Sequence, residues 1–253
     1  GLLANARQQM REMIRQNYNH PSVAAWGIAN EVAFGASLIW TGPIQLMFTR
    51  FSADREYLNE RAQILPNLFG ALALTGAASA LFAAAVSVWF TGYDMRFKVA
   101  AGTGFVCLCE VWLVVVVLTG LRAHLRVLTC FALGYAITFG ACLAFARHGE
   151  TGLLAGFALG QAGLLFSAWW VLARALPGAG AVEFRFMQRG ALYLELGVIG
   201  LFSNLAVWID KLLFWLDPRT SHAAIGPLRA SEVYDLPIFL GYLTIVPGMA
   251  VFL

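Results

Sequence analysis

The sequence predicts an all-α protein, a bundle of about seven helices that crosses a membrane several times. Two observations support this fold class. First, 60% of the 253 residues are hydrophobic and only 12% are charged, with a mean hydropathy of +0.71, whereas about a quarter of the residues in a soluble domain are charged. Second, apolar stretches recur along the chain, and several approach or exceed the roughly 20 residues that a helix needs to span a bilayer.

Seven apolar stretches define the expected helices in chain order. They cover about residues 34–48, 67–91, 97–120, 125–146, 152–174, 191–214 and 236–253. The first stretch is short and contains Pro43, and the last continues to the end of the sequence without a polar flank. We therefore expect the sequence to be cut at both ends relative to a complete membrane protein.

The basic residues of the loops predict the orientation, because loops rich in Lys and Arg stay in the cytoplasm. Alternate loops carry Arg50, Arg55, Arg61, Arg122, Arg126, Arg174, Arg185 and Arg189. The loops between them carry Arg96, Lys98, Arg147, Arg219 and Arg229. This bias places residues 49–66 and 175–190 in the cytoplasm and residues 216–235 outside.

Charge and cysteine usage exclude several classes of function. The net charge of +3 is small and spread over short loops, so the chain lacks the concentrated basic face of a nucleic-acid-binding protein. The four cysteines lie inside apolar runs without the spacing of a metal site, and we expect free thiols, no metal and no cofactor. They are Cys107, Cys109, Cys130 and Cys142.

A glycine repeat predicts one close contact between helices. Gly152, Gly156 and Gly160 recur at intervals of four and share one face of a helix. Small residues at this spacing let two backbones approach closely in a membrane. Packing against another helix of the same chain is favoured over a contact between two copies.

The first 33 residues differ from the rest and are interpreted as a separate soluble-looking fragment. Residues 3–17 predict a helix that Pro21 ends, and Val23–Ile28 predicts a short buried strand with Asn30 and Glu31 at its carboxyl end. A (β/α)-barrel exposes catalytic acids in this way.

The segment from Arg15 to Val23, followed by Trp26–Ile28 and Asn30–Glu31, resembles the acid/base region of family 2 glycoside hydrolases. The resemblance implies that Glu31 corresponds to the acid that protonates the leaving oxygen and Asn30 to the residue that bonds the neighbouring sugar hydroxyl. A retaining enzyme also needs a second carboxylate as nucleophile, which this chain does not supply. We therefore expect no enzymatic activity.

Residues 34–253 form the expected transmembrane domain, and from residue 36 the chain resembles the PelG family of Pel exopolysaccharide transporters, within the multidrug/oligosaccharidyl-lipid/polysaccharide exporter superfamily that includes flippases. The stretches that carry the resemblance are Leu38–Gln45, Phe48–Arg55, Leu65–Ala71, Trp208–Lys211, Ile225–Ser231 and Tyr234–Phe239. The likeness implies a protein of the bacterial inner membrane that moves a cationic amino-sugar polymer with other Pel synthase and export subunits.

That family has about twelve helices in two lobes, so the resemblance also implies that the first helix and most of the second lobe are missing. Because an alternating-access transporter moves one bundle against the other, we expect an incomplete transporter. Two alternatives stay open. One is a membrane-attached remnant of a β-galactosidase-type hydrolase, and the other is a scaffold of a polysaccharide synthase complex that does not itself transport.

Four ionisable residues inside the apolar stretches are candidates for the transport path, because charges within a membrane are costly and often functional. Glu110 lies in the middle of the third stretch, where it could serve ion coupling, line the path or form a structural hydrogen bond. Glu195 lies near a helix end. Asp210 is expected to face inward, whereas its neighbour Lys211 is expected to snorkel toward the interface.

Overall fold

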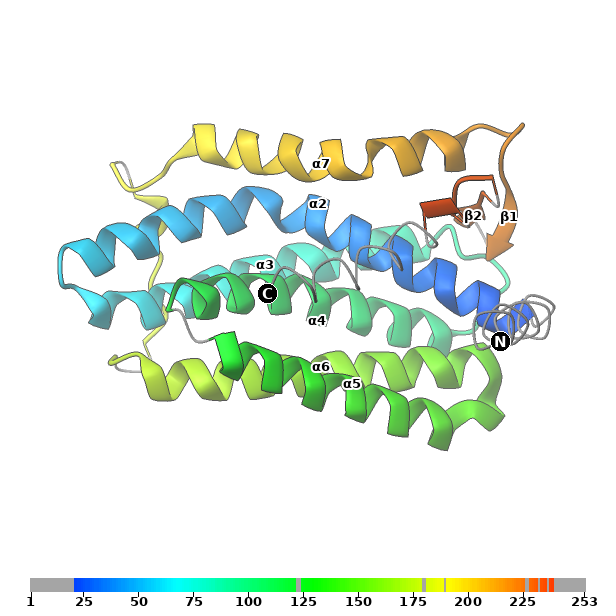
Figure 1. Ribbon diagram of the computed structural model, residues 1–253, viewed down its shortest axis with the longest axis horizontal. Helices are drawn as coiled ribbons and strands as arrows, with labels where there is room; N and C mark the ends of the chain where they lie inside the picture. The colour runs from blue at the N-terminus through cyan, green and yellow to red at the C-terminus, as the bar shows by residue number, and fades with distance from the viewer. Residues whose placement is uncertain are drawn as a thin grey trace, which may run out of the picture.

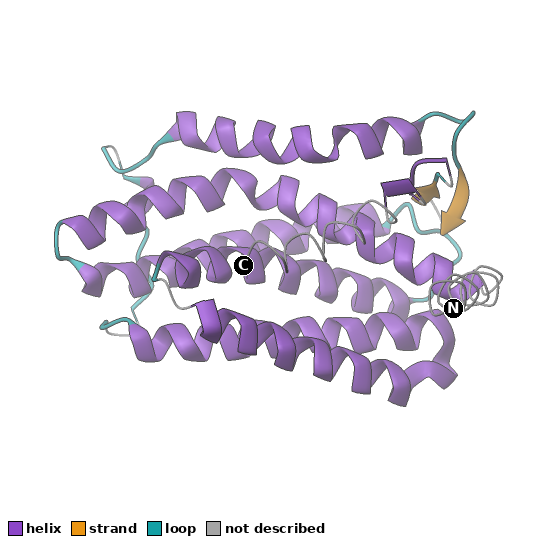
Figure 2. Ribbon diagram, viewed as in Figure 1, coloured by secondary structure: helices purple, strands orange, loops and turns teal. Residues whose placement is uncertain are grey.

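The computed structural model describes residues 21–121, 124–178, 181–188, 190–225, 228–231, 233–235 and 237–238, with the backbone alone described for residues 21–30, 224 and 225. The described chain forms long helices and one small hairpin, as Figure 2 shows. The helices are α2 (Pro21–Tyr57), α3 (Ile64–Ser87), α4 (Met95–Gly120), α5 (His124–Phe145), α6 (Gly149–Ala175) and α7 (Leu194–Leu216), with the short 3-10 helices η1 (Arg61–Gln63), η2 (Ala146–His148) and η3 (Arg185–Met187). The strands β1 (His222–Ile225) and β2 (Leu228–Ala230) pair antiparallel.

The all-α class is confirmed. Within the described residues, five segments are long and apolar enough to cross a membrane, and one of them, His124–Ala175, contains both α5 and α6. The described chain therefore carries six of the seven expected membrane helices. Nearly all of the seventh, at residues 236–253, lies outside the described residues, as does the expected helix over residues 3–17.

Successive helices run up and down the bundle, so that alternate loops lie at the same end (Figure 1). We call the end that carries β1 and β2 the hairpin end; the connections α3–α4 and α5–α6 also lie there. The connections α2–α3, α4–α5 and α6–α7 lie at the opposite end. This arrangement agrees with the two groups of loops that differ in their content of basic residues.

Both ends of the first helix differ from expectation. The backbone is helical from Pro21, so the predicted strand over Val23–Ile28 is wrong, and α2 continues through Pro43 for 37 residues. Proline suits the first position of a helix because its missing N–H would have no partner there. A strand also needs a neighbouring strand for its backbone groups, and the only sheet among the described residues pairs β1 with β2.

The tightest hydrophobic packing lies toward the opposite end of the bundle. Side chains from α2, α3, α4, α6 and η3 form one core there. Its most deeply buried members are Phe48, Leu68, Leu113, Val114, Leu118, Leu172 and Phe186. Two cavities lie instead nearer the hairpin end, next to the amino-terminal half of α2.

Asn67 attaches the α6–α7 connection to this core. The side chain is fully buried, and its Oδ1 accepts hydrogen bonds from the backbone N–H of Arg185 at 2.6 Å and of Phe186 at 3.3 Å. Its Nδ2 donates to the backbone oxygen of Gln63 at 2.8 Å. One amide side chain thus satisfies backbone groups of a loop that would otherwise lose their solvent.

The glycine repeat packs within the chain, as predicted. Gly152, Gly156 and Gly160 of α6 all face α5 or the turn that leads from it. A Cβ atom on Gly156 would lie only 2.7 Å from the backbone nitrogen of Cys142. Since no side chain larger than hydrogen fits at such a distance, these residues set how closely α5 and α6 approach.

Candidate functional site

A buried ionic cluster joins α2, α7 and the segment after the hairpin. Lys211 of α7 bonds through Nζ to Oε2 of Glu31 on α2, and the same nitrogen lies 3.6 Å from Oδ1 of Asp235. The Lys211 side chain is 7% exposed, whereas that of Glu31 is 44% exposed. We call these three residues the lysine cluster. The pairing explains why Lys211 can be buried, because a buried charge is costly unless it is paired.

Two tryptophans enclose the lysine. The Lys211 ammonium lies 5.7 Å from the ring centre of Trp208 and 5.0 Å from that of Trp215, both within the range of a cation–π contact. Trp215 also donates its indole N–H to Asp235, with 3.3 Å between the nitrogen and each carboxylate oxygen. The Asp235 carboxylate accepts a further bond from the backbone N–H of Ser231 at 2.9 Å. The hairpin segment is therefore fastened to the end of α7.

The two neighbouring charges of α7 lie on the opposite sides from those predicted. Asp210, expected to face inward, is exposed, and Lys211, expected to snorkel, is buried. Adjacent helical residues point about 100° apart, so only one of them can face α2, and Glu31 there favours the lysine. The Asp210 carboxylate instead accepts a bond from the hydroxyl of Tyr234, whose ring stacks on Phe214 with 4.8 Å between ring centres.

Close contact between α2 and α7 continues from the lysine cluster toward the opposite end of the bundle. A Cβ on Gly42 of α2 would lie 2.6 Å from the backbone oxygen of Gly200 on α7, and one on Gly35 would lie 2.8 Å from the Trp208 ring. Beside this contact is a cavity of about 430 Å³, which is partly open to the exterior. We call it the tryptophan cavity, because Trp40, Trp208 and Trp215 line it together with Pro43 and apolar residues of α2, α3 and α7.

Glu110 lies apart from the lysine cluster, on α4. Its carboxylate faces Gly76 of α3, where a Cβ would lie 2.7 Å from Oε1. Near it in the sequence, Trp112 donates its indole N–H to Oγ of Ser37 on α2 at 2.9 Å. The region around Glu110 therefore contains one hydrogen bond between α4 and α2, and the Glu110 carboxylate itself packs against α3.

Glu195 is the second residue of α7, is exposed, and lies at the opposite end of the bundle. An acid in the first turn of a helix stabilises the helix dipole, which gives Glu195 a structural explanation. The structure thus brings Lys211 and Asp210 to one region and leaves Glu110 and Glu195 elsewhere.

Asp235 was not among the predicted transport-path residues, and the predicted role of Glu31 was a different one. The available signal was charge: one lysine inside an apolar helix requires an acidic partner, and Glu31 and Asp235 border the other apolar segments. Within the described part of the chain, no group of three or more His, Cys, Asp and Glu side chains is arranged to hold a metal ion.

Apolar helices of membrane-spanning length, a buried charge cluster between two of them and glycine-mediated packing define a multi-pass membrane protein. Residues 27–253 match the family model described as "PelG: Putative exopolysaccharide Exporter (EPS-E)". The chain belongs to this exopolysaccharide exporter family and is a membrane component of polysaccharide export. This is a family of transporters and not of enzymes. No curated protein and no solved structure matches the chain.

The match confirms the resemblance to PelG over the transmembrane helices. It begins at residue 27, so Asn30 and Glu31 fall inside the matched region. The resemblance of the first residues to family 2 glycoside hydrolases gains no support from the comparisons.

Proposed function

We propose that this chain moves a Pel-type polysaccharide across the bacterial inner membrane together with synthase and export subunits, and that the polymer passes the lysine cluster and the tryptophan cavity. The observation that carries this proposal is the buried Lys211, which is held between Glu31 and Asp235 and contacts two tryptophans that line that cavity. Ionisable residues at such positions in membrane helices generally serve transport paths.

The chemistry of the region suits a cationic sugar polymer. Two carboxylates and one ammonium give the lysine cluster a formal net charge of −1, and the Glu31 side chain is nearly half exposed. A carboxylate can accept bonds from amino or hydroxyl groups, and the faces of tryptophan rings attract cations. A passing amino group could therefore replace Lys211 as the partner of Glu31.

The packing of α7 supports a role in movement. At the edge of the bundle in Figure 1, α7 packs mainly on α2. The contact between Gly42 and Gly200 lets the two helices approach without interlocking side chains, and the pair Glu31–Lys211 joins them at the hairpin end. Alternating access requires one group of helices to rock against another; opening this pair would release α7 from α2.

Export of polysaccharide by cells that carry substituted copies of the gene tests the proposal. We expect Lys211→Met and Glu31→Gln to lower secreted polysaccharide about tenfold or more while the amount of protein in the membrane stays within about twofold. Arg219→Gln is the matched control, because Arg219 is an exposed cation at the same end. Normal export by both cluster variants would refute a role for the lysine cluster in transport.

The scaffold alternative predicts a different pattern. A scaffold would lose export only when its partners dissociate, so co-purification of the synthase subunits with each variant separates the two functions. Loss of export with retained partners supports transport. Retained export with retained partners supports the scaffold.

A further inference from the structure

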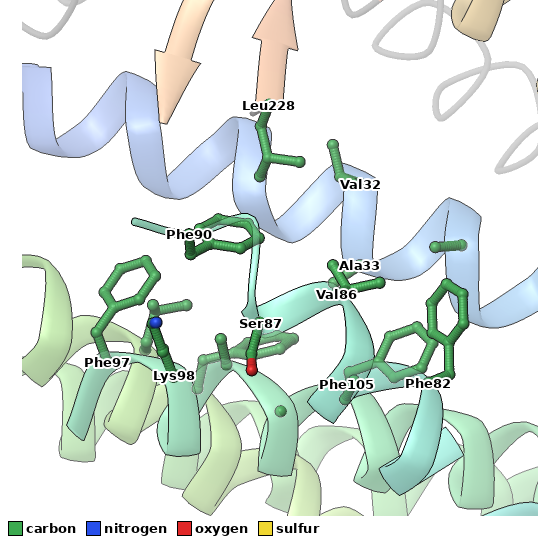
Figure 3. A pocket seen from close by; sticks show the side chains of 16 residues that line it. Val32, Ala33, Phe82, Val86, Ser87, Phe90, Phe97, Lys98, Phe105 and Leu228 are labelled. Atoms are coloured by element: carbon green, nitrogen blue, oxygen red, sulfur yellow. The ribbon is translucent and has the colours of Figure 1, made fainter. Parts of the chain in front are cut away.

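A second cavity lies at the hairpin end, enclosed by α2, α3, α4 and α6 (Figure 3). Its volume is about 160 Å³, and it is partly open to the exterior. Its walls are apolar and rich in phenylalanine, with Phe82, Phe90, Phe97, Phe105 and Phe157 among the lining residues. We call it the phenylalanine cavity. Unlike the tryptophan cavity, it does not border α7.

Two polar side chains, Ser87 and Lys98, line the phenylalanine cavity, and only Lys98 carries a charge. Ser87 already donates its hydroxyl to the backbone oxygen of Ala84 at 2.7 Å. Lys98 is half-buried, and its ammonium makes no hydrogen bond or ion pair within the described part of the chain. In Figure 3 the Lys98 nitrogen lies among the lining side chains, near Phe97. The cavity therefore combines an apolar interior with one cation that has no partner among the described residues.

The lining of the cavity extends along α4. Lys98, Ala101, Gly102 and Phe105 line it from one face of this helix, and the seven helical steps from the first to the last span roughly 10 Å. Lys98 lies in the first turn of α4, at the hairpin end, while Phe105 lies deeper. Small residues on three walls, including Ala33 and Ala83, keep the space open.

We propose that the phenylalanine cavity binds an anionic phospholipid, with one acyl chain between the phenylalanines and the phosphate on Lys98. The lining extends along α4, which is the direction of lipid chains in a bilayer, and the ammonium lies near the expected level of the head groups. Basic pockets between membrane helices bind anionic head groups in this manner. A sugar polymer would find almost no hydrogen-bonding partners there, and a neutral lipid would leave the cation unpaired.

Native mass spectrometry of the purified full chain, incubated with equal amounts of phosphatidylglycerol and phosphatidylcholine, tests this site. We expect the wild-type protein to retain phosphatidylglycerol preferentially, and Lys98→Gln to lower that preference about tenfold. Arg96→Gln is the matched control, because Arg96 is exposed, lies two residues away and does not line the cavity. It should leave the preference unchanged.

Filling the cavity should remove binding of either lipid. A Cβ on Gly102 meets only the Cβ of Ala83, at an ordinary 3.6 Å, so Gly102→Leu places its side chain in the open space. Ala101→Phe provides a second filled variant if the first does not fold. Equal retention of the two lipids by the wild type, or retention unchanged by Lys98→Gln or by a folded filled variant, would overturn the proposal. The result is independent of polysaccharide export, because the measurement contains no polymer.

Discussion

Replacing Gly42 by alanine should loosen the contact between α2 and α7. The new Cβ would lie 2.6 Å from the backbone oxygen of Gly200 and 2.7 Å from Nδ2 of Asn204. The helices would have to separate by roughly 0.5–1 Å, and a gap of that size loses a quarter to a half of the dispersion energy of the contact.

The expected net loss follows from two opposing effects. Overpacking of this kind costs about 1–3 kcal/mol, whereas alanine in a helix interior is about 0.5–1 kcal/mol more favourable than glycine. The difference ranges from about 0 to 2.5 kcal/mol, and we expect Gly42→Ala to destabilise the protein by about 1 kcal/mol. In a protein of this length each kcal/mol shifts the Tm by about 2–4 °C.

Gly140→Ala is the matched control, since nothing lies within 4 Å of a Cβ at that position of α5. This substitution gains the higher helix propensity of alanine without a steric clash, so it should raise the Tm slightly. Thermal unfolding of both variants in the same detergent, followed by size-exclusion chromatography of the soluble fraction, measures the two shifts. A Tm for Gly42→Ala at or above that of the wild type would refute the reasoning, because the shifts must have opposite signs.

Three further predictions concern other parts of the bundle. Asn67→Ala leaves the backbone N–H of Arg185 without its acceptor, so trypsin should cleave after this residue faster than in the wild type, consistent with a loss of about 1–3 kcal/mol. Glu110→Gln should leave the Tm nearly unchanged if the carboxyl only forms a hydrogen bond, and lower secreted polysaccharide if it lines the path. In a background without native cysteines, Asn59→Cys should react with an impermeant maleimide only from the cytoplasmic side and Arg219→Cys only from outside; labelling of both from one side would contradict the up-and-down topology.

Most of the fold was predictable because a membrane imposes simple constraints. Apolar length predicted the positions of the helices from α3 to α7. The spacing of Gly152 and Gly156 predicted close packing against another helix of the chain, and the structure shows that this helix is α5. The start of α2 was not predictable in the same way. Residues 17–31 carry a local pattern that resembles a hydrolase motif, and that pattern outweighed the absence of any partner for a strand over residues 23–28.

The candidate site was only partly predictable, because its members come from distant parts of the chain. Lys211 was recognisable as a charge within an apolar helix. The direction in which the Lys211 side chain points was not predictable. Whether Asp210 or Lys211 faces the bundle depends on which helix lies beside α7 and on the charge of that helix. The partner Glu31 is 180 residues away in the sequence, and local spacing contains no information about such a pairing.

The hairpin of α5 and α6 has a consequence for how the protein enters the membrane. Only η2, three residues long, separates the two helices, and Gly156 and its neighbours let them pack along their length. Short connections add little entropy to the closure of a loop, and helices that are stable in the bilayer assemble once inserted. These two helices can therefore pack together in the bilayer before the ribosome has made Lys211, and Lys211 pairs with Glu31 at a later stage of synthesis.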